Sequence, residues 1–302
     1  MSDPPELIAA LVTLLGDPNP AVHGAARKRL LTLGPGAMAP LEQALEGVRD
    51  PETRGRIVGV LECLGALELD RRLEAFGRLP DEEMDLERGA ALLASIAYPD
   101  HTAEELGREL DRLAEGLAPR LARCTTLSTR LDCLCHHLYV EHRLHGEPGD
   151  GNDPDDGLLH RVILRRHGLP IALAAITVLV GRRVGLPVYG VAMPCHYIAK
   201  AVEGGEEILF DPWSGGARLS RDHCAGLLGS WGIPFRDAYL EVASPRATLA
   251  RMCRNLLRPY WRRGDHQRLG HVVRFLHALE GGEGATGCRC AGPAAGLRPQ
   301  DA

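Results

Sequence analysis

Two residues of one short stretch have the types and the spacing of a catalytic pair. His196 lies inside the segment VYGVAMPCHYIAKAV, and Asp211 ends the segment EEILFD after a turn at Gly204-Gly205. Segments rich in β-branched and aromatic residues predict strands, so two adjacent antiparallel strands would bring the two side chains together. An Asp that accepts a hydrogen bond from one ring nitrogen of a His orients the other nitrogen for acid–base chemistry.

The element that precedes these strands is the segment GLPIALAAITVLVGRRVGLP. Pro170 can open a helix, Arg182 and Arg183 fit its last turn, and Gly185 can end it. Between these ends the residues are apolar nearly all round. A helix that is apolar on every face is a buried helix, so we expect this one to pack beneath the two strands.

The order of buried helix, His strand and Asp strand resembles the papain-like transglutaminase core. In that family a Gly-x-Cys sequence opens the helix, a His lies on one strand, and Asp-Pro lies on the next. Here His196 and Asp211-Pro212 fall where the pattern places them, and Trp213 follows. The resemblance implies a buried helix packed on a small antiparallel sheet, with His196 and Asp211 as the remnant of a catalytic dyad.

The same resemblance places Gly168-Leu169-Pro170 at the Gly-x-Cys opening, so Pro170 occupies the position of the cysteine. A slip of two residues would put Ala172 there instead. Neither position carries a nucleophile, and residues 169–176 contain no Cys, Ser or Thr. Acyl transfer through a cysteine needs a thiolate at a helix N-terminus beside the His. The resemblance therefore implies a catalytically degenerate core.

Residues 80–280 resemble one branch of this family, the SirB-type transglutaminase-like proteins of bacteria. Five segments carry the resemblance in family order: LERGAALLASIAYPD, DPDDGLLHRVILRRHGLPIAL, VYGVAMPCHYIAK, ILFDPWSGGARLS and RMCRNLLRPYWRRGD. The chain has Cys195 where the family usually has Gly, and Asp156-Gly157 where it usually has Asn-Ser. The family has no established reaction, and its members commonly lack the cysteine.

Two hypotheses for the pair stay open. His196 and Asp211 can be a satisfied polar pair in a protein-interaction or regulatory module. They can also be a base pair that activates water or a substrate hydroxyl in a hydrolase or acyltransferase. Rescue by another thiol is disfavoured, because Cys195 would point to the opposite face of a strand from His196 and Cys224 lies on the following helix.

The composition is that of an ordinary globular protein, with 45% hydrophobic and 25% charged residues. A net charge of −5 gives no basic footprint for nucleic acid, and no apolar run is long enough to span a membrane. The beginning MSDPPELIAA lacks the basic region of a signal peptide. We therefore expect a cytoplasmic protein whose partner is another protein, while its oligomeric state is not predicted.

Residues 1–76 contain an internal repeat. GDPNPAVHGAARKRLLTLG is echoed by RDPETRGRIVGVLECLG, with Asp17-Pro18 and Asp50-Pro51 at equivalent places. A period of about 33 residues predicts stacked helical hairpins, which here resemble HEAT repeats. In each copy Asp is the expected N-cap and Pro the expected first helical residue. Such a pair of repeats either binds a partner or caps the core that follows.

The segment TLSTRLDCLCHHLYVEHRLHG raises the question of a metal site. Its candidate ligands are Cys133, Cys135, His136, His137, His142 and His145. Two residues that lie two apart on a helix face apart, and the paired spacing of zinc sites is missing. A helix with buried Cys and partly exposed His is favoured over a zinc site, and no metal or cofactor is predicted.

The segment EPGDGNDPDDG (147–157) holds five acidic residues and should overhang the His-bearing site. It lacks the spacing of a calcium-binding loop, so a solvated loop is favoured over a cation site.

Two helix caps are also predicted. Thr102 with Glu105 predicts a capping box, and Ser220 is expected to cap a helix that follows Asp211.

The residue pattern of the C-terminal part predicts two helices separated near Gly264-Asp265. Such a pair is typical of a tetratricopeptide-like hairpin. The tail from Gly281 is of low complexity and predicted to be disordered; its Cys288 and Cys290 have no predicted role.

The predicted fold class is α+β and mostly helical, a papain-like transglutaminase core flanked by α-helical repeats. The predicted parts are 1–76 (HEAT-like repeats), 80–243 (transglutaminase-like domain), 244–280 (hairpin) and 281–302 (tail).

Overall fold

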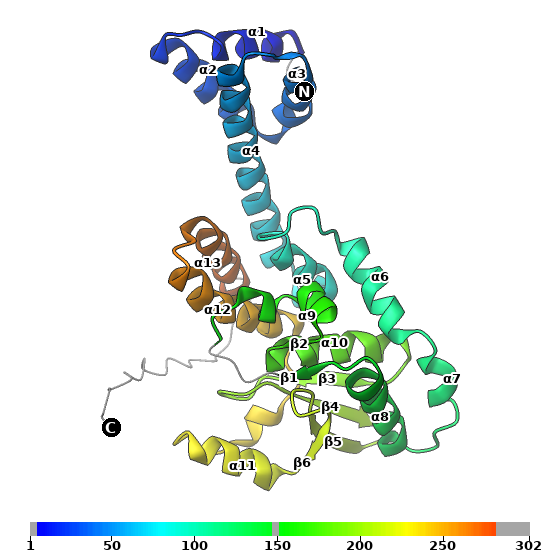
Figure 1. The fold of residues 1–302 in the computed structure, drawn as a ribbon. Coiled ribbons are helices and arrows are strands. Elements are labelled where there is room, and N and C mark those ends of the chain that lie inside the picture. Colours follow the sequence, from blue (N-terminus) through cyan, green and yellow to red (C-terminus); the bar gives the residue numbers. More distant parts are fainter. Residues whose placement is uncertain (1–4, 147–150, 282–302) are drawn as a thin grey trace, which may run out of the picture. The chain divides into compact units, whose positions relative to one another are not determined.

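A computed structural model describes residues 5–146 and 151–281 of the chain. The described residues are mainly helical, and they form two compact units, residues 1–75 and 76–302 (Figure 1). Residues 282–302 of the predicted tail and residues 147–150 of the acidic loop lie outside the described residues. None of the described helices is both long enough and apolar enough to cross a lipid bilayer.

The first unit is built from helices alone. They are α1 (Pro5–Leu15), α2 (Pro20–Leu33), α3 (Met38–Gly47) and the first part of α4 (Pro51–Gly77), with a 3-10 turn at Gly34–Ala37. The side chains that recur at helical spacing meet in one core. Its buried members include Leu11, Leu15, Leu30, Leu41, Ile57 and Leu64.

The first predicted cap in this unit is wrong. The helix does not begin at Asp17-Pro18, because Asp17 Oδ1 accepts a hydrogen bond from Asn19 N at 2.7 Å and holds a turn there. Instead α2 begins at Pro20, and Asn19 Oδ1 accepts from Ala21 N at 3.0 Å. Asn19-Pro20 therefore supplies the cap and the first helical residue.

The second predicted cap is confirmed. Helix α4 begins at Pro51, and Asp50 Oδ2 accepts hydrogen bonds from both the backbone N and the hydroxyl of Thr53, at 2.8 and 2.6 Å. These bonds lower the pKa of the Asp50 carboxyl. In both copies the residue just before the first helical proline is the cap, but in the first copy this is Asn19, two residues beyond the Asp17 that aligns with Asp50.

The second unit holds two small sheets among its helices. The helices are α5 (Leu86–Ala94), α6 (Ala103–Ala114), α7 (Leu117–Leu121), α8 (Leu127–Cys135), α9 (Leu159–Arg165), α10 (Pro170–Arg183), α11 (Arg221–Ser230), α12 (Pro245–Arg262) and α13 (His266–Glu280). A π-helical turn at His136–Glu141 extends α8, and 3-10 turns lie at Asp81–Glu83, Pro154–Gly157 and Asp237–Leu240. Thr102 caps α6 in the predicted capping box, and Ser220 caps α11 as predicted, there also in a capping box.

The main sheet is antiparallel, with strand order β3-β4-β5-β6. Its strands are β3 (Val188–Val191), β4 (Ile198–Glu203), β5 (Glu206–Asp211) and β6 (Ala217–Leu219). The turn between β4 and β5 falls at Gly204-Gly205, as predicted, and both glycines adopt positive φ, which suits a tight hairpin. A second pair, β1 (His145–Gly146) and β2 (His167–Gly168), is parallel.

Helix α10 is the buried helix that the sequence predicts. Residues 171–181 are all buried, and the helix packs against β3 and β4. Figure 1 shows α10 on one side of the main sheet and α11 on the other. The α+β fold with a buried helix on a small antiparallel sheet is therefore confirmed.

The prediction that His196 lies inside a strand is wrong. The apolar segment forms the two antiparallel strands β3 and β4, and residues 192–197 connect them. Pro194 cannot donate to a strand ladder, and Cys195 adopts a φ of 64°, which is incompatible with extended backbone. His196 thus lies in the connection, two residues before β4.

Helices α12 and α13 form the predicted pair, separated at Gly264 (φ 67°) and begun again by Asp265, which caps α13 through Arg268 N. The guanidinium of Arg246, in the first turn of α12, is buried and ties this pair to the start of the unit. It donates to the carbonyl oxygens of Gly77 at 2.8 Å and Leu279 at 2.9 Å. It also donates to Leu79 O and Asp81 Oδ1. The division at residues 243 and 244 stays a prediction.

Candidate functional site

The structure brings the two predicted site residues into contact. His196 Nε2 lies 3.0 Å from Asp211 Oδ2. Asp211 is the last residue of β5, while His196 comes just before β4, and the register pairs Ala199 with Phe210. Antiparallel pairing therefore places the two side chains at the same end of the sheet. With Nε2 held by the carboxylate, Nδ1 is the ring nitrogen left for other chemistry, and it has no hydrogen-bond partner among the described residues.

Asp211 is buried, and both of its carboxylate oxygens accept hydrogen bonds. Besides His196, its Oδ2 accepts from the Ser214 hydroxyl at 2.7 Å, and its Oδ1 accepts from Trp213 N at 2.9 Å. Burial by itself raises the pKa of the Asp211 carboxyl, but the hydrogen bonds and the neighbouring imidazole outweigh it, so the pKa is lowered. The carboxylate stays ionised and acts as an acceptor.

The loop that follows Asp211 is packed between two distant parts of the chain. The indole of Trp213 lies over Gly146, and the His196 ring meets this indole edge-on with ring centroids 6.4 Å apart. Gly216 lies against the buried Cys135 of α8. Both contacts fix the loop that holds the carboxylate, and neither could be read from the sequence because the partners are far apart along the chain.

We expect Gly146→Ala to disturb this packing. A Cβ atom at position 146 would lie 2.2 Å from the Trp213 ring, and overpacking of this kind costs about 1–3 kcal/mol. Denaturant unfolding with tryptophan emission as the signal should show a lower midpoint and a changed folded-state spectrum. Gly226→Ala is the control, because a Cβ there meets nothing within 4 Å. An unchanged midpoint for Gly146→Ala would show that the indole moves freely.

The start of α10 carries no nucleophile, as the sequence predicts. Pro170 is the first residue of the helix, and Ala172 is completely buried. Thr177 is also buried, and its hydroxyl donates to Leu173 O at 2.7 Å while lying 2.6 Å from the Tyr139 hydroxyl. The Thr177 hydroxyl therefore already has two hydrogen-bond partners.

Cys195 and Cys224, the cysteines that flank the His–Asp pair in the sequence, differ in exposure. Cys195 is exposed, and its left-handed backbone separates it from the strand geometry that the sequence predicts. Cys224 is buried in the cluster of Met193, Ile198 and Leu209, and burial raises the pKa of its thiol. A buried thiol with a raised pKa is a poor nucleophile.

The described part of the acidic loop is ion-paired, so the prediction of a solvated loop is wrong for it. Asp155 pairs with Arg161 at 2.9 Å, and Asp153 pairs with Arg165 at 2.8 Å and with Arg263 at 3.0 Å. These guanidinium groups already neutralise the carboxylates that a cation would need. Among the described residues, no three His, Cys, Asp or Glu side chains are placed to hold a metal ion.

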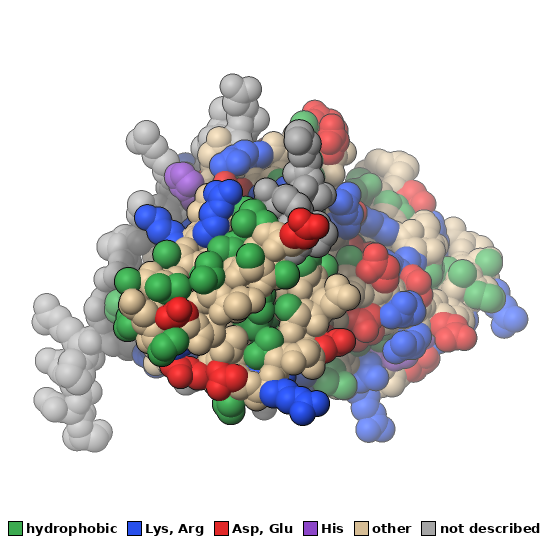
Figure 2. Space-filling model, turned by 90° about the horizontal axis from the view of Figure 1, so that it is seen from above, with side chains coloured by type: hydrophobic (Ala, Val, Ile, Leu, Met, Phe, Trp, Pro, Cys, Tyr) green, Lys and Arg blue, Asp and Glu red, His purple; other side chains and the backbone are tan. Residues whose placement is uncertain are grey.

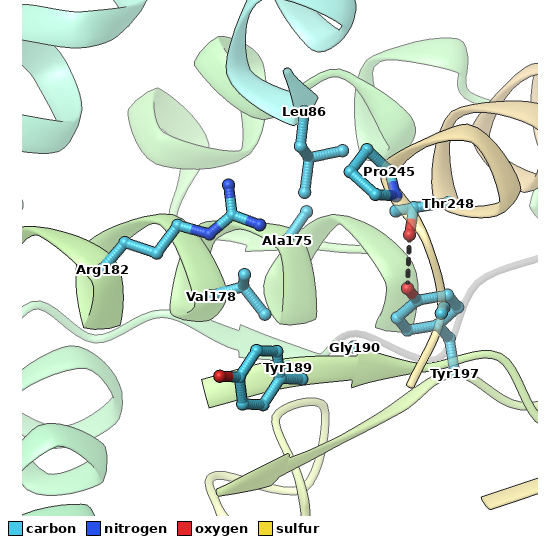
Figure 3. A pocket seen from close by; sticks show the side chains of 10 residues that line it. Leu86, Ala175, Val178, Arg182, Tyr189, Gly190, Tyr197, Pro245 and Thr248 are labelled. Atoms are coloured by element: carbon cyan, nitrogen blue, oxygen red, sulfur yellow. Dashed lines mark hydrogen bonds between the residues drawn. The ribbon is translucent and has the colours of Figure 1, made fainter. Parts of the chain in front are cut away.

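A small hollow in the described part lies away from the His–Asp pair (Figure 3). Its lining includes Arg182, Tyr189 and Tyr197, and the Tyr197 hydroxyl bonds the Thr248 hydroxyl at 2.8 Å. Its volume is about 20 Å³, enough for roughly one water molecule. Neither His196 nor Asp211 lines it, so it is not the cleft of the dyad.

A second cluster of titratable side chains lies around His160. This side chain is 8% exposed, stacks on His101 with ring centroids 4.2 Å apart, and meets Tyr98 edge-on. Neither ring nitrogen has a hydrogen-bond partner in the described structure. Burial, with the nearby charges of His101 and Arg161, lowers the pKa of His160 to about 4.

This burial predicts acid sensitivity. The unfolded chain binds the His160 proton with a pKa of about 6.5, above the folded value, so the stability is intact above that pH and declines as the pH falls toward 4. Between pH 7 and 5 the loss from this residue is about 2 kcal/mol. Denaturant unfolding of His160→Phe should show a shallower pH dependence than the wild type. His136→Phe, at an exposed position, should keep the wild-type slope; equal slopes for all three proteins would contradict the prediction.

The family model described as the transglutaminase-like superfamily matches residues 104–254. A UPF0162 protein of Xylella fastidiosa is 28% identical over 183 residues, which cover 58% of this chain and 65% of the relative. A UPF0162 protein of Pseudomonas aeruginosa is 29% identical over 197 residues, 62% of this chain and 69% of the relative.

Human F-box only protein 21 is 23% identical over 228 residues, 66% of this chain and 36% of that protein. No solved structure matches. The chain thus spans about two thirds of the bacterial relatives and about a third of the human one. Since the family model covers half of the chain, including the dyad and α10, this protein belongs to the transglutaminase-like superfamily.

Proposed function

We propose that this chain is a catalytically degenerate transglutaminase-like protein that acts as a protein-interaction or regulatory module. The observation that carries the proposal is Pro170, which opens α10 where the thiol chemistry of this superfamily would need its cysteine. The next candidate position, Ala172, is apolar and buried. A His–Asp pair without a nucleophile can persist as a satisfied polar pair that fixes the end of the sheet.

Exposed aromatic side chains support the interaction part of the proposal. Trp231 follows α11 and Trp261 lies in the last turn of α12, and they are 66% and 67% exposed. Tryptophan is enriched among the residues that dominate protein–protein binding. On the face seen in Figure 2, acidic and basic side chains are interspersed, which suits a protein partner better than nucleic acid. The similarity to proteins named F-box only protein 21 is compatible with such a role.

The finer family assignment is part of the same proposal. We place the chain in the SirB-type branch on the five segments in family order, and we interpret residues 1–76 as HEAT-like repeats on the paired proline-started helices α2 and α4. The cysteines of the described residues are free thiols, which supports a cytoplasmic location.

The test compares the wild type with His196→Ala on panels of amide and ester substrates. The proposal expects both proteins to match the buffer blank, and it expects His196→Ala to retain the partners that co-purify with the wild type. The matched binding variants are Trp231→Ala and Trp261→Ala, at least one of which should lose a partner. Turnover by the wild type that disappears in His196→Ala would overturn the proposal.

A hydrolase or acyltransferase that uses the His196/Asp211 dyad without a cysteine is the second candidate. It is favoured by the 3.0 Å contact between Nε2 and Oδ2 and by the free Nδ1. A His oriented in this way can act as a general base toward water or a substrate hydroxyl. This candidate expects turnover that falls by about 100-fold or more in His196→Ala and also falls in Asp211→Asn.

A further inference from the structure

The hollow shown in Figure 3 has an apolar floor and a polar rim. Its buried floor is formed by Leu86 of α5 and by Ala175 and Val178 of α10. Its exposed rim carries Arg182 of α10 and Tyr189 of β3, and the figure shows the Arg182 side chain turned toward the hollow. None of the described residues that line the hollow is acidic, so the charge of its rim is positive.

The two adjacent arginines in the last turn of α10 differ in their contacts. Arg183 donates to Asp111 at 2.6 Å and to Glu87 at 2.8 Å. Arg182 forms neither an ion pair nor a hydrogen bond within the part of the chain that the structure describes. A guanidinium is a fork of donors that matches a carboxylate. Arg182 can therefore bind an anion that comes from outside this chain.

The free edge of β3 supplies a second donor. Val202 N donates to Pro187 O at 3.0 Å, which sets the alternation of bonded and non-bonded pairs between β3 and β4. Gly190, opposite Ala199, falls in a non-bonded pair, so its N–H and its C=O both point away from β4. Its carbonyl oxygen accepts from Ala243 N at 2.8 Å, in agreement with this direction. Among the described residues no acceptor outside the sheet bonds the Gly190 N–H, although Gly190 is buried and lines the hollow.

The buried hydroxyl pair of the hollow offers no further donor. Thr248 Oγ1 donates to Ser244 O at 3.0 Å, so the 2.8 Å bond between the two hydroxyls uses the proton of Tyr197. The donors that remain are the guanidinium and the phenol of the rim and one backbone N–H. A buried N–H without an acceptor is costly, so the hollow favours a ligand that accepts hydrogen bonds and carries negative charge.

We propose that this hollow is a docking site for an acidic side chain of a partner protein. One carboxylate oxygen takes the place of a single water molecule, accepts from Gly190 N–H and faces the Arg182 guanidinium. The volume of about 20 Å³ excludes a cofactor or metabolite, whose pockets measure roughly 300 Å³ or more. The rest of the ligand therefore lies outside the rim, where Arg and Tyr are residue types that dominate protein interfaces. This docking role rests on the interaction function proposed above and gives the partner's chemistry.

The test follows the full-length, nitrogen-15-labelled protein by nuclear magnetic resonance while capped tripeptides are added. Ac-Ala-Glu-Ala-NH2 carries a side-chain carboxylate, and Ac-Ala-Gln-Ala-NH2 is its neutral isostere. We expect the Glu peptide to shift the signals of the Gly190 amide and the Arg182 Nε–H in a saturable way, and the Gln peptide to leave both in place. No shift at about 50 mM Glu peptide, where even a Kd near 10 mM would largely fill the site, would overturn the proposal.

A third peptide distinguishes the source of the carboxylate. Ac-Ala-Gln-Ala-OH carries only the carboxylate of the chain terminus. We expect it to bind more weakly than the Glu peptide. Tighter binding of this free acid would overturn the assignment to a side chain, because it would identify a chain terminus as the ligand.

Variants decide whether the guanidinium is needed. Arg182→Gln should abolish the shift of the Gly190 amide, whereas Arg262→Gln should retain it. Arg262 is the matched control, since it lies in the last turn of α12 as Arg182 does in α10, and it does not line the hollow. Circular dichroism checks the fold, and Arg182→Lys, which keeps the charge without the fork, replaces a Gln variant that fails to fold and should weaken binding. Equal binding by Arg182→Gln and wild type would contradict the proposal.

The outcome is separable from the test of catalysis. Turnover that disappears in His196→Ala would overturn the degenerate core but would leave this site in place, because neither His196 nor Asp211 lines the hollow. Absence of the peptide shifts would remove this site, while the argument from Pro170 would stand.

Discussion

Arg246→Ala should lower the free energy of unfolding by about 3–5 kcal/mol, since three backbone acceptors lose their donor. Arg246 is 8% exposed, and its guanidinium donates to three backbone carbonyl oxygens and to Asp81. Alanine would leave the three carbonyl oxygens without this donor, and buried acceptors that lack a donor are costly. In a unit of this size the melting temperature should fall by roughly 10 °C. Thermal and urea unfolding followed by circular dichroism measure both quantities.

Arg254→Ala is the matched control, since it removes the same side chain from the same helix. Arg254 forms an exposed pair with Glu280, and exposed pairs contribute about 1 kcal/mol or less. A loss in Arg246→Ala no larger than in Arg254→Ala would mean that water reaches the carbonyl oxygens of Gly77 and Leu279. In that case the hydrogen bonds of Arg246 do not hold α12 in place.

Asp211→Ala should be the most disruptive change at the candidate site, with a loss of about 2–4 kcal/mol in unfolding free energy. The alanine removes the acceptor of three hydrogen bonds, from His196, Ser214 and Trp213 N. Because the pKa of the Asp211 carboxyl is lowered in the folded state, its contribution is present above about pH 4 and declines below that value. The gap between wild type and variant, measured by urea unfolding, should therefore narrow in acid.

Asp211→Asn keeps one carbonyl acceptor and the side-chain shape, so it should cost less than Asp211→Ala. Ser230→Ala is the control for a lost serine hydroxyl bond, since Ser230 Oγ donates to Leu227 O at an exposed site, and it should be nearly neutral. Equal stability of Asp211→Ala and wild type at pH 7 would show that the three donors find other partners, and the dyad would not fix the end of the sheet.

The sequence predicts the parts of the site that depend on local pattern. Helix α10 is long, apolar all round and opened by proline, so its presence and its burial follow from the residues alone. The contact between His196 and Asp211 also follows, because one tight glycine turn joins β4 to β5 and sets their register. In these cases a short stretch determines its own geometry.

What the sequence does not predict depends on backbone detail or on distant contacts. Cys195 takes a left-handed conformation that few non-glycine residues adopt, so the strand expected at His196 ends before it. The hydrogen bond from Tyr139 to Thr177 and the packing of Trp213 on Gly146 join residues far apart in the chain. No local periodicity contains such pairs, although the glycine at 146 is a signal of close approach.

Pro170 at the start of α10 also limits the backbone donors of the first turn. A transition state for acyl transfer needs donors aimed at a developing oxyanion, and backbone N–H groups of a helix's first turn are natural donors. Pro170 has no N–H, and the N–H groups of Ala172 and Leu173 point back to Leu169 O at 3.0 and 3.1 Å. The first turn thus offers Ile171 N–H alone, so Pro170→Cys would introduce a thiol and a second backbone donor in one substitution.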